Sequence, residues 1–443
     1  MNRSIRPAHR LVALSAAALL TLGACGNGAD KPAADSTTAA EQTEAAHEGE
    51  HEGEHDVEGS EGGTEASAQT PRLAITYDGG IAILDANTLE SEGEFKLEGF
   101  NRINPAGDGR HVAVTTTGGW ALLDAGTWSQ AHGDHAHYYT GEPSLSEVIL
   151  KAEKPAHVVV HDGLVAFFDD ATGKVTVVDA AEWAEALEHK HVHAVREYTA
   201  EKAHHGVAVA NSAGELLVSR GDSEKRTGAM ILDKDGKEIV VNDECPALHG
   251  EAAFKNTSGE EVIALGCEDG VLAFHGDHAH KIASPDSYGR IGSVFAADDN
   301  DVVVGDYKLD PEAGPALEKI ALIDTAKDTL VSVDPFGGSG AKYGGKGISR
   351  GAEGEVLVLG TDGKLRVLDP ATGDELRSID VVKAWDVPED WQAPRPAVVE
   401  LAGMAYVTDP ATKTIHIVDY DGGKVWKSVE VGKEVNEIVG VTG

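Results

Sequence analysis

Histidines gathered in short clusters are the residues of this chain best suited to chemistry. The sequence has 20 histidines in 443 residues. Two identical hexapeptides, His-Gly-Asp-His-Ala-His, begin at His132 and His275, and further histidines alternate at 189, 191 and 193. Neutral imidazole is the commonest side-chain ligand of zinc, and nearby carboxylates lower the cost of holding a dication. The clusters therefore predict a protein that handles a borderline transition metal.

Each hexapeptide offers three imidazole nitrogens within six residues. The aspartate between them, Asp134 or Asp277, is an additional oxygen ligand or an acceptor that orients an imidazole. Because Gly-Asp is an ordinary turn dipeptide, a duplicated polar hairpin turn is the alternative interpretation. In the first hexapeptide the candidate metal ligands are His132, His135 and His137.

The first 24 residues predict export. Arg3, Arg6 and Arg10 precede an apolar run over 11–22, which is too short to span a membrane as a mature helix. The sequence Leu22-Gly-Ala-Cys25 resembles the bacterial lipoprotein box, in which Cys25 is acylated; an ordinary signal peptide with an incidental cysteine is the alternative. We expect a protein exported and lipid-anchored to the outer face of the bacterial cytoplasmic membrane, or periplasmic.

Residues 25–69 predict a disordered acidic tether, since they have almost no large apolar residue to bury. His47, His51 and His55 recur in it every four residues, so a helical turn would place all three on one face. We interpret the segment as a flexible metal-gathering arm. The alternative is a solvated acidic spacer, which explains the glutamates but not the regular histidines.

The charge balance narrows the class of partner. The chain has 75 acidic and 37 basic residues, a formal net charge of −38. This argues against nucleic acid, whose phosphates require lysine and arginine, and suits a cation-attracting surface.

The cysteines fit an oxidising compartment. If Cys25 carries lipid, Cys245 and Cys267 remain as an even pair, for which a disulfide is the preferred interpretation. A two-thiolate metal site is the alternative.

Residues 70–443 repeat one pattern, a short β-rich run that ends in Leu-Asp or a near relative and is followed by a turn. The anchor positions are 39 to 55 residues apart: Asp85, Asp124, Asp179, Asp233, Phe274, Asp324, Asp369 and Asp419. Repeats of this length with glycine-rich turns are typical of propeller blades. Helical periodicity is confined to about 181–187. The sequence predicts an all-β fold, a single β-propeller of about eight blades, or seven if the first or last unit merges in ring closure.

In a propeller, the remaining histidines would lie beside the central channel. Three successive repeats open their first strand with histidine, at His157, at His204 or His205, and at His249, while His161 ends the first of these strands. Because first strands line the central channel, we expect the openers to converge on one ion at its mouth. Histidines that merely pack in the core are the alternative.

Several of these motifs resemble the AztD-type zinc metallochaperones. The similar segments run over 45–440 and include His132-Gly-Asp-His-Ala-His-Tyr-Tyr139, Lys154-Pro-Ala-His-Val-Val-Val-His-Asp-Gly163, Ala203-His-His-Gly-Val-Ala-Val209, Cys245-Pro-Ala-Leu-His-Gly-Glu-Ala252 and Gly266-Cys-Glu-Asp-Gly270.

The resemblance implies a non-enzymatic propeller that holds Zn(II) outside the cytoplasm and passes it to the solute-binding protein of a zinc ABC importer. It implies ligands among the arm histidines, the first hexapeptide, and His157, His161, His204, His205 and His249. The alternatives are a propeller enzyme (a metal-dependent lactonase or a quinone-dependent dehydrogenase) and a plain interaction scaffold. An enzyme of either kind would show a calcium site rich in carboxylate and asparagine, and the dominance of histidine argues against it.

Overall fold

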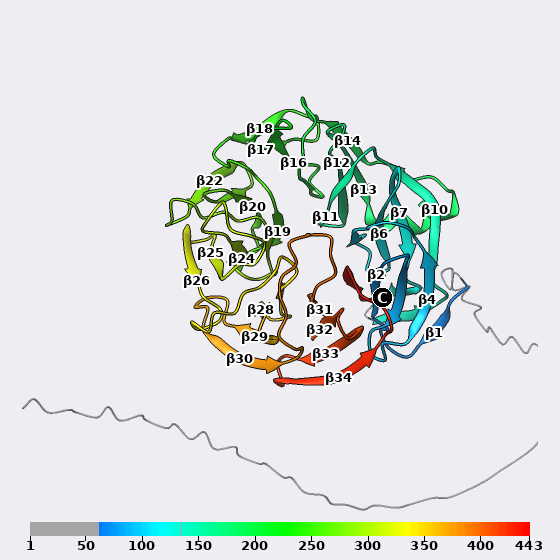
Figure 1. Cartoon of the computed structure of the whole chain (residues 1–443). Helices are drawn as coiled ribbons and strands as arrows, with labels where there is room; N and C mark the ends of the chain where they lie inside the picture. The colour runs from blue at the N-terminus through cyan, green and yellow to red at the C-terminus, as the bar shows by residue number, and fades with distance from the viewer. Residues whose placement is uncertain (1–61, 134) are drawn as a thin grey trace, which may run out of the picture. The chain divides into compact units, whose positions relative to one another are not determined.

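The computed structural model describes residues 62–133 and 135–443, and the structural statements below concern these residues. The predicted signal peptide, Cys25, and the arm histidines His47, His51 and His55 lie outside them. Eight four-stranded antiparallel sheets follow one another around a central axis, with the first strand of each sheet nearest the axis (Figure 1). The structure therefore confirms the predicted β-propeller and its count of eight blades.

In every blade the strands follow one another from the axis outward. The first blade is β35 (Ile438–Val441), β2 (Arg72–Tyr77), β3 (Gly80–Asp85) and β4 (Ser91–Lys96). The second is β5 (Ile103–Pro105), β6 (His111–Thr116), β7 (Gly119–Asp124) and β10 (Ser144–Lys151). The third is β11 (Pro155–His161), β12 (Leu164–Asp169), β13 (Lys174–Asp179) and β14 (Arg196–Thr199). The fourth is β15 (Ala208–Ala210), β16 (Leu216–Gly221), β17 (Arg226–Leu232) and β18 (Glu238–Asn242).

The remaining four blades follow the same order. The fifth is β19 (Glu251–Lys255), β20 (Glu261–Cys267), β21 (Gly270–His275) and β22 (His278–Ala283). The sixth is β23 (Val294–Phe295), β24 (Val302–Tyr307), β25 (Lys319–Asp324) and β26 (Thr329–Val333). The seventh is β27 (Ile348–Arg350), β28 (Val356–Leu359), β29 (Lys364–Leu368) and β30 (Glu375–Asp380). The eighth is β31 (Val398–Leu401), β32 (Met404–Asp409), β33 (Thr414–Asp419) and β34 (Lys424–Glu430).

The core lies between neighbouring blades. Middle strands such as β2 and β3 are buried along almost their whole length, because each blade is covered on both faces, and their sequences are continuous apolar runs. Leu357 and Leu365 of the seventh blade, for example, pack against Val398 and Val407 of the eighth. The outermost strands, such as β34, instead alternate between exposed and partly buried residues. The burial pattern of a strand thus depends on its distance from the axis.

The repeated aspartate has a local structural role. It stands at the end of the third strand of a blade, where its carboxylate accepts hydrogen bonds from the backbone of the following turn. Asp85 Oδ1 accepts from Asn87 N at 3.0 Å and Thr88 N at 2.7 Å, and Asp369 Oδ1 accepts from Ala371 N at 2.8 Å. Such bonds favour turns over strand continuation. The anchor residues therefore mark the turns that lead from the third strand of a blade to its outermost strand.

The ring is closed by the end of the chain. Strand β35 supplies the innermost strand of the first blade and pairs antiparallel with β2, from Arg72 opposite Val441 to Ile75 opposite Ile438. The first blade is therefore built from both ends of the described chain.

One element stands outside the blades. Between β7 and β10 the chain forms a hairpin of β8 (Thr127–His132) and β9 (His135–Thr140), and β1 (Thr64–Ala66) pairs with β9 to complete a three-stranded sheet. β1 corrects one predicted boundary, because 64–66 were expected in the disordered tether. Three residues suffice to form a strand here, because their backbone groups pair with the edge of β9.

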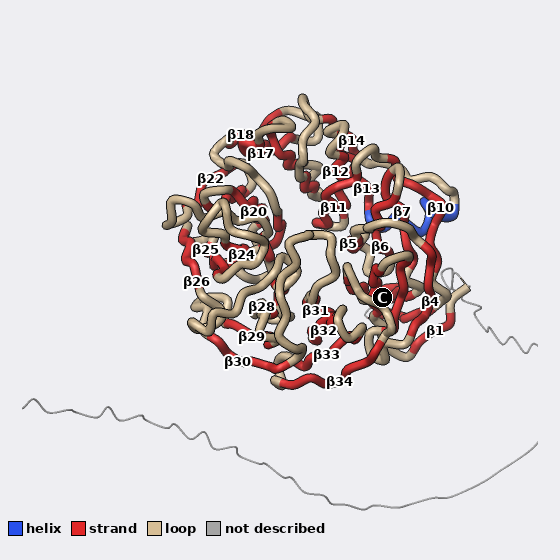
Figure 2. Tube along the Cα trace, in the orientation of Figure 1, coloured by secondary structure: helices blue, strands red, loops and turns tan. Residues whose placement is uncertain are grey.

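Helix is confined to one place in the described residues (Figure 2), a 3-10 turn at Ala180–Glu182 followed by α1 (Trp183–Glu188). This is the stretch where helical periodicity was predicted. The residues after it, 189–193, form no strand. The alternation of their three histidines, which in a strand would place the three rings on one side, therefore has no such effect here, because these residues follow directly on the end of the helix. No helix in 62–443, Asp134 apart, has the length and apolarity to span a bilayer.

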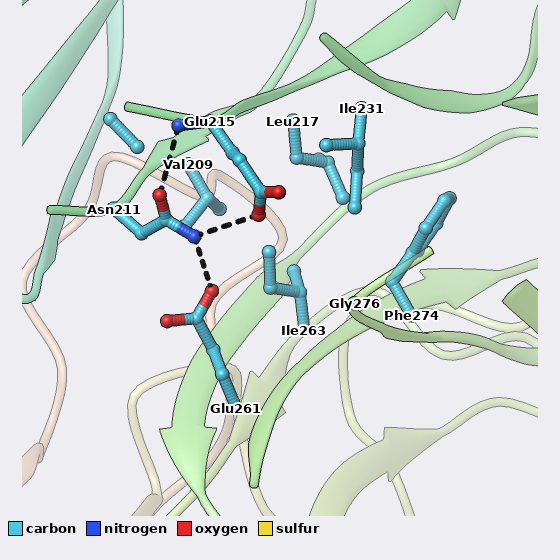
Figure 3. Close-up of a pocket in the computed structure, with 10 residues that line it drawn as sticks. Val209, Asn211, Glu215, Leu217, Ile231, Glu261, Ile263, Phe274 and Gly276 are labelled. Carbon is cyan, nitrogen blue, oxygen red and sulfur yellow. Dashed lines mark hydrogen bonds between the residues drawn. The ribbon is translucent and has the colours of Figure 1, made fainter. Parts of the chain in front are cut away.

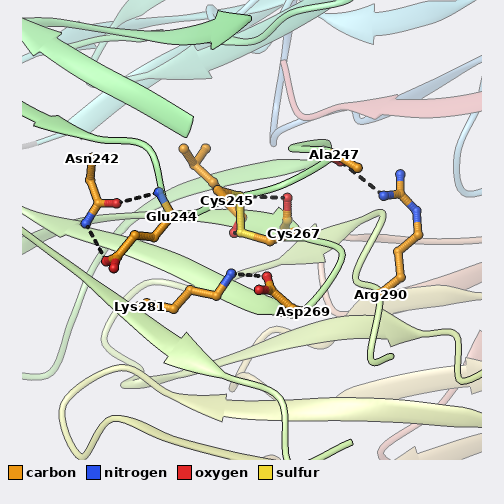
Figure 4. The surroundings of a disulfide bond; sticks show 10 residues. Asn242, Glu244, Cys245, Ala247, Cys267, Asp269, Lys281 and Arg290 are labelled. Atoms are coloured by element: carbon orange, nitrogen blue, oxygen red, sulfur yellow. Dashed lines mark hydrogen bonds and ion pairs between the residues drawn. A yellow bond between two sulfur atoms is a disulfide. The ribbon is translucent and has the colours of Figure 1, made fainter. Parts of the chain in front are cut away.

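The predicted disulfide between Cys245 and Cys267 is present (Figure 4), with the two Cα atoms 5.0 Å apart and both residues fully buried. It joins the segment before β19 to the last residue of β20 and rules out the two-thiolate metal site. The segment that it anchors carries His249.

Candidate metal centre

Three histidines from three consecutive blades meet near the axis. His157 lies on β11, His205 shortly before β15, and His249 shortly before β19. One ring nitrogen from each lies within 4.8 Å of the others, and the ring centroids are 4.9 to 5.2 Å apart. We call these three residues the channel triad. The predicted convergence of first-strand openers is therefore found in the structure.

Each ring of the channel triad is held through its Nδ1 atom. His157 Nδ1 lies 3.0 Å from Glu251 Oε1, His205 Nδ1 lies 2.7 Å from Asp170 Oδ2, and His249 Nδ1 donates to the Gly292 carbonyl at 2.6 Å. The Nε2 atoms are thereby left to face the common centre, where those of His157 and His205 are 3.3 Å apart. Anchoring one ring nitrogen to a carboxylate or carbonyl is how proteins orient metal-binding histidines.

The backbone around His249 is fixed from several sides. His249 N donates to Gly266 O at 2.9 Å, and Gly266 N donates to Gly250 O at 3.0 Å. Gly250 has a φ of +74°, and a Cβ there would lie 2.6 Å from Gly292 O, so only glycine allows this approach. With the nearby disulfide, these contacts hold His249 and Glu251 in one rigid turn.

The surroundings move the pKa values of two triad members in opposite directions. Burial, together with the neighbouring His157 and His205, lowers the pKa of His249 to about 4. Burial also acts to lower the pKa of His157, but the attraction and hydrogen bond of Glu251 outweigh it and raise that pKa above its usual value. At neutral pH His249 is therefore a neutral ligand, whereas His157 retains its proton more strongly.

A cavity of about 630 Å³ adjoins the channel triad. Besides the three rings, its wall includes Asp170, Glu251, Arg102, Lys154 and Trp391. Glu251 Oε2 is buried and has no hydrogen-bond partner among the described residues, which makes it a candidate fourth ligand. The cavity is larger than an ion, so a water molecule or a side chain from another protein can also reach the centre.

Two of the predicted inner-strand ligands lie elsewhere. His204 is 2% exposed, its Nδ1 donates to Lys202 O at 2.8 Å, and its Nε2 is 2.9 Å from Ser219 Oγ. Both nitrogens are therefore used in packing, and His205 is the member of the pair that reaches the centre.

His161 lies at the far end of β11, about 13 Å along the strand from His157. Its Nε2 is 3.0 Å from Glu261 Oε2, and the other oxygen of that carboxylate accepts from Asn211 at 2.8 Å (Figure 3). The structure thus separates His161 from the channel triad, because His161 ends the strand that begins at the mouth of the channel.

Sequence reasoning missed Asp170 and Glu251 as parts of the site. Glu251 carried a signal, since it follows His249 by two residues within a motif already identified. Asp170 carried none, because it follows β12 and its proximity to His205 depends on how the third and fourth blades stack.

The two identical hexapeptides have different geometries. In the first, ring nitrogens of His132, His135 and His137 lie within 4.8 Å of one another. We call these three residues the hairpin triad. In the second, His275 faces Glu260 and His280 faces Asp328, and its three histidines do not converge in this way. The two hexapeptides also lie at different places in the fold. The first forms the tip of the extra β8–β9 hairpin, and the second forms the β21–β22 turn within a blade.

A curated relative among known proteins matches most of the chain. The zinc chaperone AztD of Citrobacter koseri is 26% identical over 379 residues, which cover 81% of this chain and 84% of that protein. The crystal structure of Citrobacter koseri AztD has a TM-score of 0.72 at 22% identity and covers 85% of this chain and 99% of the other. The structure of apo AztD from the same organism gives 0.70 at 21% identity, with the same coverage. No family model matches the chain. The resemblance to AztD predicted from the motifs is thereby confirmed, and the structures agree in fold.

Proposed function

We propose that this chain is a zinc metallochaperone that holds Zn(II) at the channel triad and passes it to another protein. The observation that carries the proposal is the orientation of His157, His205 and His249, each fixed at Nδ1 so that Nε2 is directed to one centre. Three imidazoles with a fourth position filled by Glu251 or by an incoming group fit the four-coordinate preference of zinc. The similarity to a protein named as a zinc chaperone supports this choice of metal and a function other than an enzyme.

Transfer requires that ligands be exchanged one at a time. Within the channel triad, the side chain of His205 is 37% exposed and that of His157 is 18% exposed. The carboxylate that holds His205 also contacts a second group, since Lys154 Nζ lies 3.4 Å from Asp170 Oδ2. An acceptor ligand entering the cavity therefore replaces His205 first, while His157 and His249 still hold the ion.

The acceptor that we propose is the solute-binding protein of a zinc ABC importer. We also propose that the mature chain starts at an acylated Cys25 and is held at the outer face of the cytoplasmic membrane. The arm histidines His47, His51 and His55 would then gather zinc near that surface. The acidic balance of the chain supports such a cation-collecting role.

The test is zinc competition against a chelator of known affinity for the wild type and His249→Ala. His193→Ala is the matched control, because His193 is a histidine 70% exposed in the loop after α1. We expect the tight class of zinc to disappear only in His249→Ala. Zinc-loaded protein mixed with the purified solute-binding protein should transfer its ion faster than the free chelator removes it. Retention of tight binding in His249→Ala would refute the channel site, and transfer no faster than chelation would refute the chaperone role.

A further inference from the structure

The residues that open the first strands surround the channel mouth, and the two halves of this ring differ in charge. On one half, the third, fourth and fifth blades supply the channel triad. On the other half, the residues just before β27, β31, β35 and β5 include Lys346, Arg395, Glu437 and Arg102. Three cations thus accompany one carboxylate, in a chain that has 75 acidic and only 37 basic residues. This local excess of positive charge favours an anionic ligand.

Arg102 is the cation of this group that is available to a ligand. Glu437 Oε1 lies 2.6 Å from Lys346 Nζ, whereas Glu437 Oε2 lies 3.6 Å from Arg102 Nε, which is too long for a hydrogen bond. The side chain of Arg102 is 52% exposed, and its two terminal nitrogens make no hydrogen bond within 62–133 and 135–443. Arg102 lines the same cavity as the channel triad, so these nitrogens can bind a carboxylate there through two parallel hydrogen bonds.

The cavity also has an apolar wall, which Trp391 supplies. Trp391 lies in the loop 381–397 between β30 and β31, which reaches over the centre of the ring (Figure 1). Its side chain is 57% exposed, and its ring makes an edge-to-face contact with Phe100 at 5.1 Å between centroids. Arg395 donates to two carbonyls of the same loop, at 2.5 Å and 3.2 Å, and so holds it in place. The volume of about 630 Å³ is typical of sites for small organic molecules and exceeds what an inorganic anion fills.

We propose that this cavity binds a small organic polycarboxylate together with the metal ion. One carboxylate of the ligand occupies the fourth coordination position at the channel triad, a second pairs with Arg102, and the carbon chain between them lies against Trp391. Carboxylate oxygen is an ordinary zinc ligand, and the planar guanidinium matches a carboxylate. The inference rests on the proposed zinc-binding function and deepens it, because the protein then carries a zinc carboxylate complex rather than a bare ion.

Cobalt(II) in place of zinc tests the proposal, because its visible absorption changes when a carboxylate enters its coordination sphere. Protein loaded with one equivalent of cobalt is titrated with citrate or with acetate, in the wild type, Arg102→Ala and Arg377→Ala. Arg377 is the matched control, an arginine that is 39% exposed on the outermost strand β30 and paired with Asp421.

The two ligands should respond differently to the loss of Arg102. We expect Arg102→Ala to weaken citrate binding about 10–100-fold, the range of hydrogen bonds to a charged group. Acetate binding should be unchanged, since acetate has no second carboxylate to reach Arg102. Arg377→Ala should match the wild type for both ligands. The tight class of zinc measured without carboxylate should be kept in Arg102→Ala, because Arg102 is not a metal ligand.

The outcomes separate this proposal from the proposed function. If the wild type binds tight zinc, but citrate binds equally to Arg102→Ala or only strips the metal from the protein, the carboxylate site fails and the proposed function stands. Equal loss of citrate binding in Arg102→Ala and Arg377→Ala also overturns the site. If the tight class of zinc is absent in the wild type, the proposed function fails.

A second variant covers the case in which Arg102→Ala does not fold like the wild type. Thermal unfolding of Arg102→Ala should match the wild type, because half of this side chain is exposed. Arg102→Lys keeps the charge but lacks the planar pair of donors, so it should lose part of the affinity for citrate and none for acetate. Unchanged citrate binding in Arg102→Lys and Arg102→Ala would remove Arg102 from the site.

Discussion

The channel triad and the hairpin triad present the same three ligands at the same spacing, but they are built in opposite ways. The channel histidines come from three blades and span 157 to 249, and two of them are held by buried carboxylates. The hairpin histidines come from six consecutive residues, and their one carboxylate partner, Glu65, is 63% exposed. The difference teaches that ligand identity and spacing define where a metal can bind, whereas burial and anchored Nδ1 atoms decide how firmly it is held.

The strongest test of this contrast is removal of a channel ligand. His249→Ala should weaken the tight class by several kcal/mol, since two histidines and a partly hydrated ion remain. His205→Ala added to it should cost little more, because residues that act as one site are not additive. Chelator competition for the two single variants and the double variant measures this. Small, additive losses would show that the two histidines serve separate weak sites.

Neutralising the channel carboxylate should have the next largest effect. Glu251→Gln removes both the charge that orients His157 and the candidate fourth ligand. Loss of a carboxylate that orients a metal-binding histidine typically lowers metal affinity about 10–100-fold. Gln keeps the size of the side chain, so the fold should be unchanged. Chelator competition measures the zinc affinity, and a thermal melt without zinc measures the stability of the fold. An unchanged affinity would remove Glu251 from the site.

Acid should release zinc from the channel, and the pKa values give the window. The pKa of His157 is raised above 6.5, so His157 holds a proton that zinc must displace, and affinity should fall about tenfold per pH unit below that raised value. His249, with a pKa of about 4, adds a second proton only near pH 4.

Titrations from pH 8 to pH 5, with proton release followed in weak buffer, check this expectation. Glu251→Gln should lower the pH at which the zinc affinity begins to fall, although the affinity at pH 8 is itself weaker, because the charge that raises the pKa of His157 is gone. If the pH at which the affinity begins to fall rises or stays in place in this variant, the assignment is contradicted.

The smallest effect is expected from the equivalent change at the hairpin. Glu65→Gln should lower the affinity of the hairpin triad for zinc only a few-fold, since an exposed carboxylate is screened by water and contributes about 1 kcal/mol or less. Hydrogen exchange of 127–140 across a zinc titration gives the shift. A loss as large as that from Glu251→Gln in the channel would mean that burial does not distinguish the two sites.

Much of the fold was predictable because its repeat has a local cause. An aspartate that bonds to the next turn, as Asp85 and Asp369 do, must stand at a strand end, and it recurs once per blade apart from the copy at Phe274. The strand openers His157 and His249 could be assigned from this register.

The remaining features of the site depend on tertiary contacts that the spacing of the repeats does not predict. His204 and His205 are adjacent in an irregular segment, and only the packing of His204 against Ser219 shows which ring faces the axis. The two hexapeptides are identical, so their difference had to come from outside them. It comes from Glu65, 67 residues before His132, and from an extra hairpin that the blade repeat does not predict.

Closure of the ring by β35 has a consequence for the newly made chain. Until Ile438–Val441 arrive, β2 has an unpaired edge, and such an edge invites pairing with other chains. The ligands of the channel triad, in contrast, lie on three neighbouring blades in the middle of the sequence, all complete well before the last residues are made. While the chain is being completed, the channel triad can therefore assemble before the first blade is closed, and a metal ion bound there would stabilise the open intermediate until its final strand is added.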